Sequence, residues 1–259
     1  ELLFGRTGLG YSVGRVPSNS CDFSVESYSF DETDGDFDLT DFDTTVTHDA
    51  QKDGMIDMIV RATKLFNEAW KPLGEREQSY KTDSARIGAS GYEGDFKLVA
   101  SPWSPPKWMK DPSSEEDIKN GLPYATTMTG SAQPSCLREG PGPGSKYAKA
   151  WALYFSKFIT ACESLFFVWL LSCLCSDIKF NGCYVQASMV LTLPFFVGML
   201  DLKHGAPLRA VTVQNEPEFP APWEACSYTP KAEADFIGYH LGPQLQKDHP
   251  DGTCCCTRK

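Results

Sequence analysis

A candidate catalytic carboxylate, Glu216, stands at the end of an apolar run in the segment Asn215-Glu216-Pro217. The preceding residues 208–214 are mostly apolar or β-branched and lack polar alternation, which predicts a parallel strand covered on both faces. Pro217 should keep Glu216 out of the helical region, so that the chain turns there. A carboxylate just beyond a strand lies where barrel enzymes hold their catalytic groups. The plain alternative is a charged residue that caps a buried strand.

A basic and an acidic residue accompany a second predicted strand, which covers residues 11–17. Arg15 lies inside this strand, and Asp22 follows shortly after its end. Charged residues in such positions are unusual unless they have partners. We therefore expect either a plain internal ion pair or a substrate pocket.

Two tryptophans follow a third predicted strand, residues 96–100. Three prolines in the loop 101–109 are incompatible with a helix or a continued strand ladder, so Trp103 and Trp108 are held on a stiff loop just past the strand end. Aromatic faces in that position suit stacking on the apolar face of a sugar ring. A core position is the alternative, more for Trp108 than for Trp103.

Helices predicted between and after these strands would position the candidate groups. Apolar residues recur at helical spacing from Asp49 to about Trp70, and Thr229 followed by proline is a typical helix start. A capping-box spacing predicts a short helix over 111–119. Another helix should begin after the cap Ser145. It carries an aromatic face that we interpret as core, formed by Tyr147, Trp151, Tyr154, Phe155, Phe158 and Ile159.

The overall composition is that of an ordinary globular enzyme with an acidic balance. The 259 residues would suit one (β/α) barrel or two smaller domains, and the net charge of -10 without a long basic run argues against a nucleic-acid partner. Ten cysteines without CxxC or Cys/His metal spacing indicate neither a disulfide framework nor a zinc site. The acidic stretch 31–49 has Leu39 where a calcium loop needs glycine, so we interpret it as a solvated loop. We expect no metal and no cofactor.

Two long stretches depart from any regular pattern. Residues 71–95 are polar and glycine-rich without periodicity, which predicts a long excursion. Residues 164–202 contain two apolar runs, each shorter than the roughly 18 to 20 residues of a membrane helix. A hairpin of interfacial helices, a buried insertion and sequence foreign to the mature fold all stay open for this block. The chain begins at Glu1 without a methionine or a leader, which indicates either a removed signal or a start inside a longer protein.

Four short motifs identify a family when they are taken together. They are Gly14-Arg15-Val16-Pro17, Ser20-Cys21-Asp22-Phe23-Ser24, Ala100-Ser101-Pro102-Trp103 and Val213-Gln214-Asn215-Glu216-Pro217. As a set they resemble glycoside hydrolase family 30, and within it the members that hydrolyse glucosylceramide. The resemblance covers roughly residues 7–65, 96–162 and 204–250.

The resemblance implies a fold, an activity and a location. The fold is a (β/α)8 TIM barrel, the activity that of a retaining β-glycosidase, and the first candidate substrate glucosylceramide, in a lysosomal or secreted protein. A β-1,6-glucanase or xylanase of the same family is the enzymatic alternative. The alternative from another class is a non-catalytic remnant that binds carbohydrate, or that contacts a membrane through residues 164–202.

The resemblance also assigns roles to five residues. Glu216 matches the general acid/base of the family, and Asn215 matches the neighbour that binds the sugar near its 2-hydroxyl. Asp22 matches a carboxylate that grips glucose hydroxyls, and Trp103 an aromatic residue that lines the sugar site. Arg15 matches an arginine beneath the catalytic carboxylates, where its charge would favour their ionised forms.

One functional residue of a retaining glycosidase has no counterpart in the sequence. The nucleophile is expected as a Glu at the end of the seventh strand, whereas the resemblance ends near Gly252, after the helix that follows the fourth strand. Glu218 and Glu224 lie on the same loop as Glu216, so we expect neither to stand opposite it. The resemblance therefore supplies half of a two-carboxylate mechanism.

The expected domain is the N-terminal half of a barrel, about strands 1/2 to 4, over residues 1–259. We interpret 71–95 and 164–202 as insertions between barrel strands and 252–259 as an atypical tail. A half-barrel exposes two sheet edges and an unclosed core. We therefore predict that the isolated chain is poorly stable and catalytically inactive.

Overall fold

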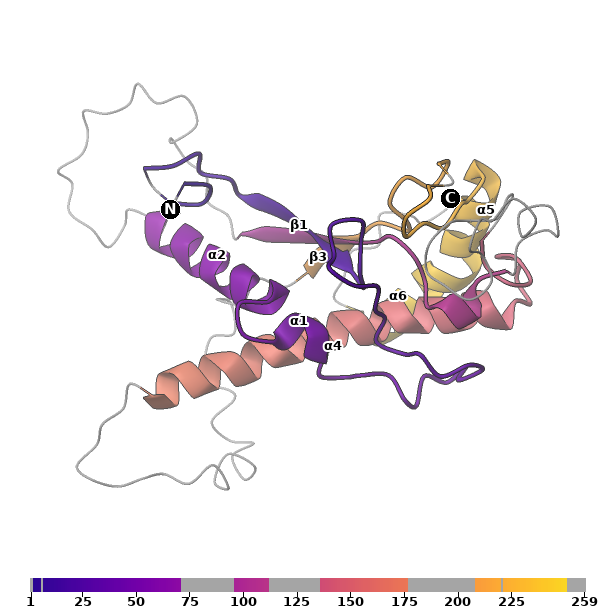
Figure 1. Cartoon of the computed structure of the whole chain (residues 1–259), viewed down its shortest axis with the longest axis horizontal. Coiled ribbons are helices and arrows are strands. Elements are labelled where there is room, and N and C mark those ends of the chain that lie inside the picture. The colour runs from indigo at the N-terminus through magenta and orange to yellow at the C-terminus, as the bar shows by residue number, and fades with distance from the viewer. Residues whose placement is uncertain are drawn as a thin grey trace.

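The computed structural model of the protein describes residues 2–5, 7–70, 96–111, 136–176, 208–219 and 221–250. Three parallel strands form its centre, in the spatial order β1-β2-β3 (Figure 1). Their bounds are Val13–Ser18 for β1, Lys97–Pro102 for β2 and Leu208–Val211 for β3. Each strand lies where the sequence predicts one, although β3 ends three residues before the predicted end.

The register of the strands decides which side chains share a face. Arg15 of β1 lies opposite Val99 of β2, and Pro17 lies opposite Ser101. On the other edge of β2, Ala210 of β3 lies opposite Val99. Since paired residues in a sheet point to the same side, the side chains of Arg15, Val99 and Ala210 share one face.

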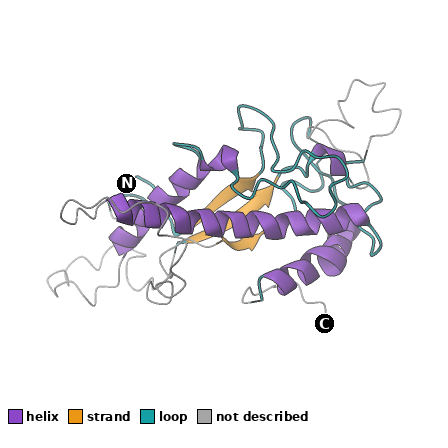
Figure 2. Cartoon of the chain, turned by 90° about the horizontal axis from the view of Figure 1, so that it is seen from below, coloured by secondary structure: helices purple, strands orange, loops and turns teal. Residues whose placement is uncertain are grey.

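The crossover helices lie on the opposite face. Helix α2 (Met55–Trp70) joins β1 to β2, and the long helix α4 (Lys146–Ser176) lies between β2 and β3 in the chain. Both lie on the same side of the sheet in Figure 1, and α4 crosses the strands in Figure 2. Because successive strands are neighbours and the described helices between them cover one face, this winding is typical of a (β/α) barrel, whereas a doubly wound sheet has helices on both faces.

The remaining helical elements are short. They are α1 (Thr47–Ala50), the 3-10 turn η3 (Lys107–Met109), α5 (Pro230–Phe236), the π turn η6 (Ile237–Leu241) and α6 (Gly242–Asp248). The last three form one continuous helical segment after β3. The sequence predicts a single helix from Asp49 to Trp70, which is wrong at its start, because a turn in which Gly54 N donates to Gln51 O separates α1 from α2.

The covered face of the sheet forms the hydrophobic core. Val16, Leu98 and Ala100 are each at most 3% exposed, and they belong to one cluster with the aromatic face of α4. Trp151 and Tyr154 of that helix are fully buried. The predicted core role of the α4 aromatics is therefore confirmed.

Two predicted helix starts are also confirmed. Ser145 Oγ accepts a hydrogen bond from Ala148 N at 3.1 Å at the start of α4, and Thr229 Oγ1 accepts one from Ala232 N at 3.2 Å at the start of α5. Each cap supplies a partner for a backbone N–H that the helix itself leaves without one.

Strand β3 differs from its prediction in burial. Arg209 and Ala210 are exposed, and Leu208 and Val211 are only half-buried. Val13 of β1, which shares the face of Arg15, is 55% exposed. The prediction of a strand covered on both faces is wrong for the described residues, because the described helices cover only one face of the sheet. The apolar composition of the strand favours burial but does not determine which elements lie over it.

A disulfide between Cys136 and Cys226 overturns the prediction that the cysteines form no such bonds. Their Cα atoms are 5.1 Å apart and they are 90 residues apart in the chain. The bond joins the segment before α4 to the loop after β3. Backbone hydrogen bonds from Cys136 N to Ser227 O and from Asp111 N to Cys136 O hold the same junction.

Several sequence predictions fall outside the described residues. These are the excursion 71–95, the short helix 111–119 beyond residue 111 and the tail 252–259. Within 164–202, the first thirteen residues continue α4 to Ser176 and the others are not described. No helix in the described ranges is long and apolar enough to span a bilayer.

Candidate active site

Arg15 is the centre of a polar cluster on the open face of the sheet. Its Nε donates a hydrogen bond to Ser101 Oγ at 2.8 Å, and a terminal nitrogen donates one to Asn215 Oδ1 at 2.8 Å. The guanidinium also lies over the ring of Trp103, 4.8 Å from the ring centroid. Two bonds in its plane and one contact on its face fix the orientation of this planar group. Residues of β1, of the end of β2 and of the segment after β3 therefore meet at one point.

Asn215 connects this arginine to the candidate acid/base. Its backbone N–H donates to Pro102 O at 2.8 Å, which continues the β2–β3 pairing beyond the end of β3. Its side-chain oxygen accepts from Arg15, so its amide nitrogen faces Glu216 and donates to Glu216 Oε2 at 3.4 Å. That last bond is long for an N–H···O contact. The Arg15 bond thus decides which end of the amide points at the carboxylate.

Glu216 occupies a strained backbone position. Its φ of 48° lies in the left-handed region, which a residue with a side chain rarely adopts. Phe219 N donates to Glu216 O at 3.0 Å and closes a turn there. The predicted turn at Pro217 is therefore confirmed, with a left-handed conformation. The carboxylate is exposed, so a ligand on the open face can reach it.

Gln214 and Thr212 belong to the cluster although sequence reasoning gives them no role. Gln214 Nε2 donates to Trp103 O at 2.6 Å and to Asn215 O at 2.9 Å, which ties the loop after β2 to the loop after β3. Thr212 Oγ1 donates to Ser101 Oγ at 2.8 Å. Their place just beyond the carboxyl end of β3 is the signal that could have found them.

Asp22 lies apart from the other candidate residues. It is exposed in the turn after β1, and in the described part of the chain none of the hydrogen bonds that join the cluster reaches it. Within the described ranges Arg15 contacts Ser101, Asn215 and Trp103 and forms no ion pair with Asp22, so the alternative of an Arg15–Asp22 ion pair is wrong. The structure brings together Arg15, Trp103, Asn215 and Glu216, and it leaves Asp22 on a neighbouring loop.

That neighbouring loop is anchored at its base. Ser20 N donates to Tyr28 O at 3.2 Å, and the Tyr28 hydroxyl donates to Asp49 Oδ1 at 2.6 Å. His48 stacks on the Tyr28 ring with 3.5 Å between centroids. Burial and the Asp49 carboxylate raise the pKa of Tyr28 well above its usual value, so the hydroxyl stays a donor.

The two other carboxylates of the loop after β3 do not join the cluster. Glu224 is 7% exposed and accepts a hydrogen bond from Ser27 Oγ at 2.6 Å, so this carboxyl group has a structural role. Burial lowers the pKa of the neighbouring Lys110 to about 7, while the Glu224 carboxylate opposes the shift. Glu218 is exposed. Trp108 is 3% exposed and donates from Nε1 to Asp31 O, so its predicted core position is confirmed.

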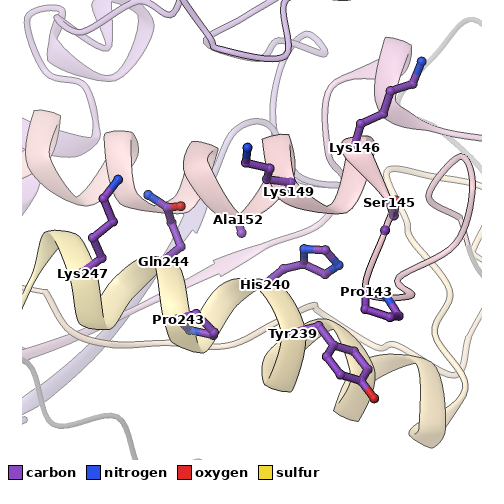
Figure 3. A pocket seen from close by; sticks show the side chains of 11 residues that line it. Pro143, Ser145, Lys146, Lys149, Ala152, Tyr239, His240, Pro243, Gln244 and Lys247 are labelled. Atoms are coloured by element: carbon purple, nitrogen blue, oxygen red, sulfur yellow. The ribbon is translucent and has the colours of Figure 1, made fainter.

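A cavity of about 410 Å³ lies elsewhere, between α4 and the η6–α6 segment (Figure 3). Its lining includes Lys149, Lys247, Gln244 and the buried ring of His240, whose Nε2 is 2.8 Å from Gly142 O. It contains none of the residues of the arginine cluster. The candidate chemistry therefore lies on the open face of the sheet and not in this cavity.

Part of the chain that carries this arrangement is similar to a known enzyme family. The profile of the glycosyl hydrolase family 30 TIM-barrel domain matches residues 2–74. The chain resembles glycosyl hydrolase family 30. The matched part includes Arg15 and Asp22, and the family and its relatives support a glycoside hydrolase.

Curated relatives extend the likeness over most of the chain. Lysosomal acid glucosylceramidase of Mus musculus is 25% identical over 252 residues, which are 96% of this chain and 32% of the mouse protein. A Caenorhabditis elegans protein that carries the glucosylceramidase name is 25% identical over 254 residues, 96% of this chain and 31% of its own length. The chain thus spans about a third of the length of these relatives.

Solved structures agree with the fold. SrfJ from Salmonella typhimurium superposes with a TM-score of 0.54 and 21% identity, over 96% of this chain and 36% of SrfJ. An endo-β1,6-glucanase superposes with a TM-score of 0.50 and 20% identity, over 95% of this chain and 35% of the glucanase. Together with the family match, these likenesses support a TIM-barrel-related fold.

Proposed function

We propose that the chain is the N-terminal part of a retaining β-glycosidase that cleaves the glucosidic bond of glucosylceramide. The observation that carries the proposal is the cluster in which Arg15, Asn215 and Glu216 are joined by hydrogen bonds at the ends of parallel strands. In barrel enzymes this end of the sheet holds the catalytic groups. The names of the mouse and nematode relatives support the glucosylceramide substrate.

The proposed mechanism assigns Glu216 as general acid and then general base. In the first step its carboxyl proton passes to the glycosidic oxygen while a second carboxylate attacks the anomeric carbon and forms a glycosyl-enzyme. In the second step Glu216 takes a proton from the water that releases the sugar. Asn215, oriented by Arg15, offers its amide nitrogen on the side of the carboxylate, where a sugar hydroxyl can accept from it.

Trp103 and Asp22 are proposed to bind the sugar. The guanidinium of Arg15 covers one face of the Trp103 ring, so a sugar must use the other face or the ring edge. Asp22 is exposed on the loop after β1, and it can accept hydrogen bonds from sugar hydroxyls without breaking an existing contact of the cluster.

The nucleophile is proposed to come from outside residues 1–259. Of the other carboxylates near Glu216 in the sequence, Glu224 is buried and held by Ser27, and Glu218 shares the loop of Glu216. A retaining mechanism needs two carboxyl groups about 5 to 5.5 Å apart on opposite sides of the scissile bond. We therefore infer that the chain alone binds a sugar but does not hydrolyse its bond.

A lysosomal or secretory location is part of the same proposal. It is supported by the lysosomal relative and by the Cys136–Cys226 bond, since disulfides persist in oxidising compartments. The glucanase likeness keeps a β-1,6-glucanase as the enzymatic alternative, because shared fold at this identity does not choose a substrate.

Two assays on the purified chain test the proposal. Binding of a glucose-configured iminosugar, measured by calorimetry, should weaken about tenfold or more in Trp103→Ala and Asp22→Asn, because each change removes a stacking face or an acceptor. Tyr11→Ala, an exposed aromatic of the segment before β1, is the matched control. A chain that does not bind the iminosugar contradicts the sugar site.

Hydrolysis of a fluorogenic β-glucoside gives the second test. We expect no turnover by the chain above the buffer rate. Turnover that disappears in Glu216→Gln would show that residues 1–259 contain a complete catalytic pair, and the inference about the nucleophile would then be wrong.

A further inference from the structure

Ser101 of the central strand contacts both a residue of β1 and a residue just after β3. It lies in β2, fully buried, and its Oγ accepts from Arg15 Nε of β1 and from Thr212 Oγ1 beside the end of β3, each at 2.8 Å. It is a small neutral residue of the central strand, without direct access to a ligand.

We propose that Ser101, supported by Thr212, is a positioning residue that holds the Arg15 guanidinium and, through it, the Asn215 amide beside Glu216. This inference rests on the proposed function of the Glu216 site. It goes beyond it by assigning a role to two hydroxyl groups that touch neither the substrate nor the reacting carboxylate.

The geometry of arginine explains why one hydroxyl matters. The guanidinium is planar, so two acceptors in its plane fix its rotation, whereas a single acceptor leaves it free to swing about that bond. Ser101 and Asn215 are these two acceptors. Without Ser101, the stacking contact with Trp103 resists tilting of the plane but not rotation within it.

Rotation of the guanidinium would change the hydrogen bond to Glu216, because Asn215 bonds to both residues. The Asn215 amide has its oxygen toward Arg15 and its nitrogen toward Glu216, and the contact of that nitrogen with Oε2 is long, at 3.4 Å. Because the Asn215–Glu216 bond is weak, the orientation of the amide is set mainly by the Arg15–Asn215 bond. Loss of the Arg15 bond therefore lets the amide turn, and the donor that faces the carboxylate is lost.

Thr212 fixes Ser101 in turn. The Ser101 hydroxyl has a choice of rotamers, and the hydrogen bond that it accepts from Thr212 Oγ1 favours the one that also accepts from Arg15. Thr212 is exposed, so its hydroxyl can be removed with little loss of packing. The relay thus has a buried member and an exposed member, which can be tested separately.

Nitrogen NMR of arginine side chains tests the relay directly in the chain as it exists. We expect the solvent exchange of Arg15 Nε–H to rise about tenfold in Ser101→Ala, the effect of losing one hydrogen bond of a charged donor, and to rise less in Thr212→Val. Thr212→Ser should restore the wild-type rate because it keeps the hydroxyl. Thr160→Val, which removes an exposed threonine hydroxyl on α4, should leave Arg15 unchanged.

Iminosugar affinity is measured on the same variants, together with their thermal unfolding midpoints. A loss of affinity that follows the Arg15 exchange rate, and that Thr212→Ser reverses, supports the positioning role. Unchanged exchange in both Ser101→Ala and Thr212→Val overturns it, whatever happens to the unfolding midpoint. If Ser101→Ala does not fold, the comparison of Thr212→Val with Thr212→Ser tests the positioning role. Absence of iminosugar binding by the wild-type chain counts against the glycosidase proposal alone, since Arg15 exchange needs no ligand.

Discussion

The two faces of the three-stranded sheet differ in what holds their side chains. On the covered face, Val16, Leu98 and Ala100 pack against the aromatic face of α4 and are almost completely buried. On the open face, Arg15 and Thr212 are exposed, and hydrogen bonds between side chains fix them. Apolar packing has no preferred direction, whereas hydrogen bonds do.

This difference separates stability from chemistry. Burial of apolar surface on the covered face is the main contribution to the folding free energy, while the open-face cluster sets the direction of a few polar groups. Substitutions on the covered face should therefore unfold the chain, and substitutions on the open face should leave it folded but with disordered candidate groups. Variants of each face test this contrast.

The largest effect is expected on the covered face, for Trp151→Ala. Trp151 is fully buried in α4 and contacts Tyr154 and Phe155. Truncation of such a side chain costs about 3 to 5 kcal/mol, because it loses transfer energy and leaves a cavity. We expect a loss of that size in the free energy of unfolding, measured by urea denaturation. Tyr11→Ala, which is 51% exposed in wild type, should change stability by less than about 0.5 kcal/mol.

The disulfide between the segment before α4 and the loop after β3 should have the next largest effect. Closing a loop over the 90 residues from Cys136 to Cys226 restricts the unfolded chain, and such bonds contribute about 2 to 4 kcal/mol. We expect Cys136→Ala with Cys226→Ala to lower the free energy of unfolding by that amount. The Arg15 Nε–H exchange rate should change little, because none of the described contacts of the cluster involves either cysteine. A large change would contradict the separation of overall stability from the geometry of the cluster.

The buried acid Asp31 should make the free energy of unfolding depend on pH. Asp31 is 2% exposed, its Oδ2 has no partner in the described residues, and burial raises its pKa to about 6. Because the folded state then holds the proton more tightly than the unfolded chain does, its contribution is fully present below about pH 4 and is lost as the pH rises through 6. We expect a loss on the order of 2 kcal/mol between pH 4 and pH 7.

Asp31→Asn is the variant that isolates this effect. It removes the titration, so the free energy of unfolding should vary less between pH 4 and pH 7 than in wild type, as measured by denaturation at each pH. Asp34→Asn, at an exposed position of the same acidic loop, is the control. Equal pH dependence in wild type and Asp31→Asn would assign the effect to other groups.

Much of the candidate cluster, though not its contacts, could be predicted from where its residues lie relative to the strands. Arg15, Trp103, Asn215 and Glu216 each belong to a strand or follow one, and the carboxyl ends of parallel strands meet at one edge of a sheet. Their contacts could not be predicted, because a one-residue change of register moves a side chain to the other face. The roles of Ser101 and Gln214 in the network follow only from the observed pairing.

Two features of the fold could not be predicted for a different reason. The spacing of Cys136 and Cys226 along the chain contains no information about their distance in space, so the disulfide emerges only from the fold. The burial of β3 depends on what lies over it. The apolar residues of 208–211 indicate a strand suited to burial, and the described helices cover only one of its faces.

The smallest effect on stability, and the sharpest on geometry, is expected for Arg15→Lys. Lysine keeps the positive charge but has one nitrogen, so it cannot donate to Ser101 and Asn215 in one plane or stack on Trp103. Because the side chain is exposed, the free energy of unfolding should change by less than about 1 kcal/mol. Iminosugar affinity should fall about tenfold, as for the loss of a hydrogen bond to a charged group. Calorimetry and urea denaturation of the same sample measure both quantities. If charge alone mattered on the open face, the affinity would be retained; if the open face contributed to folding as the covered face does, stability would fall as it does in Trp151→Ala.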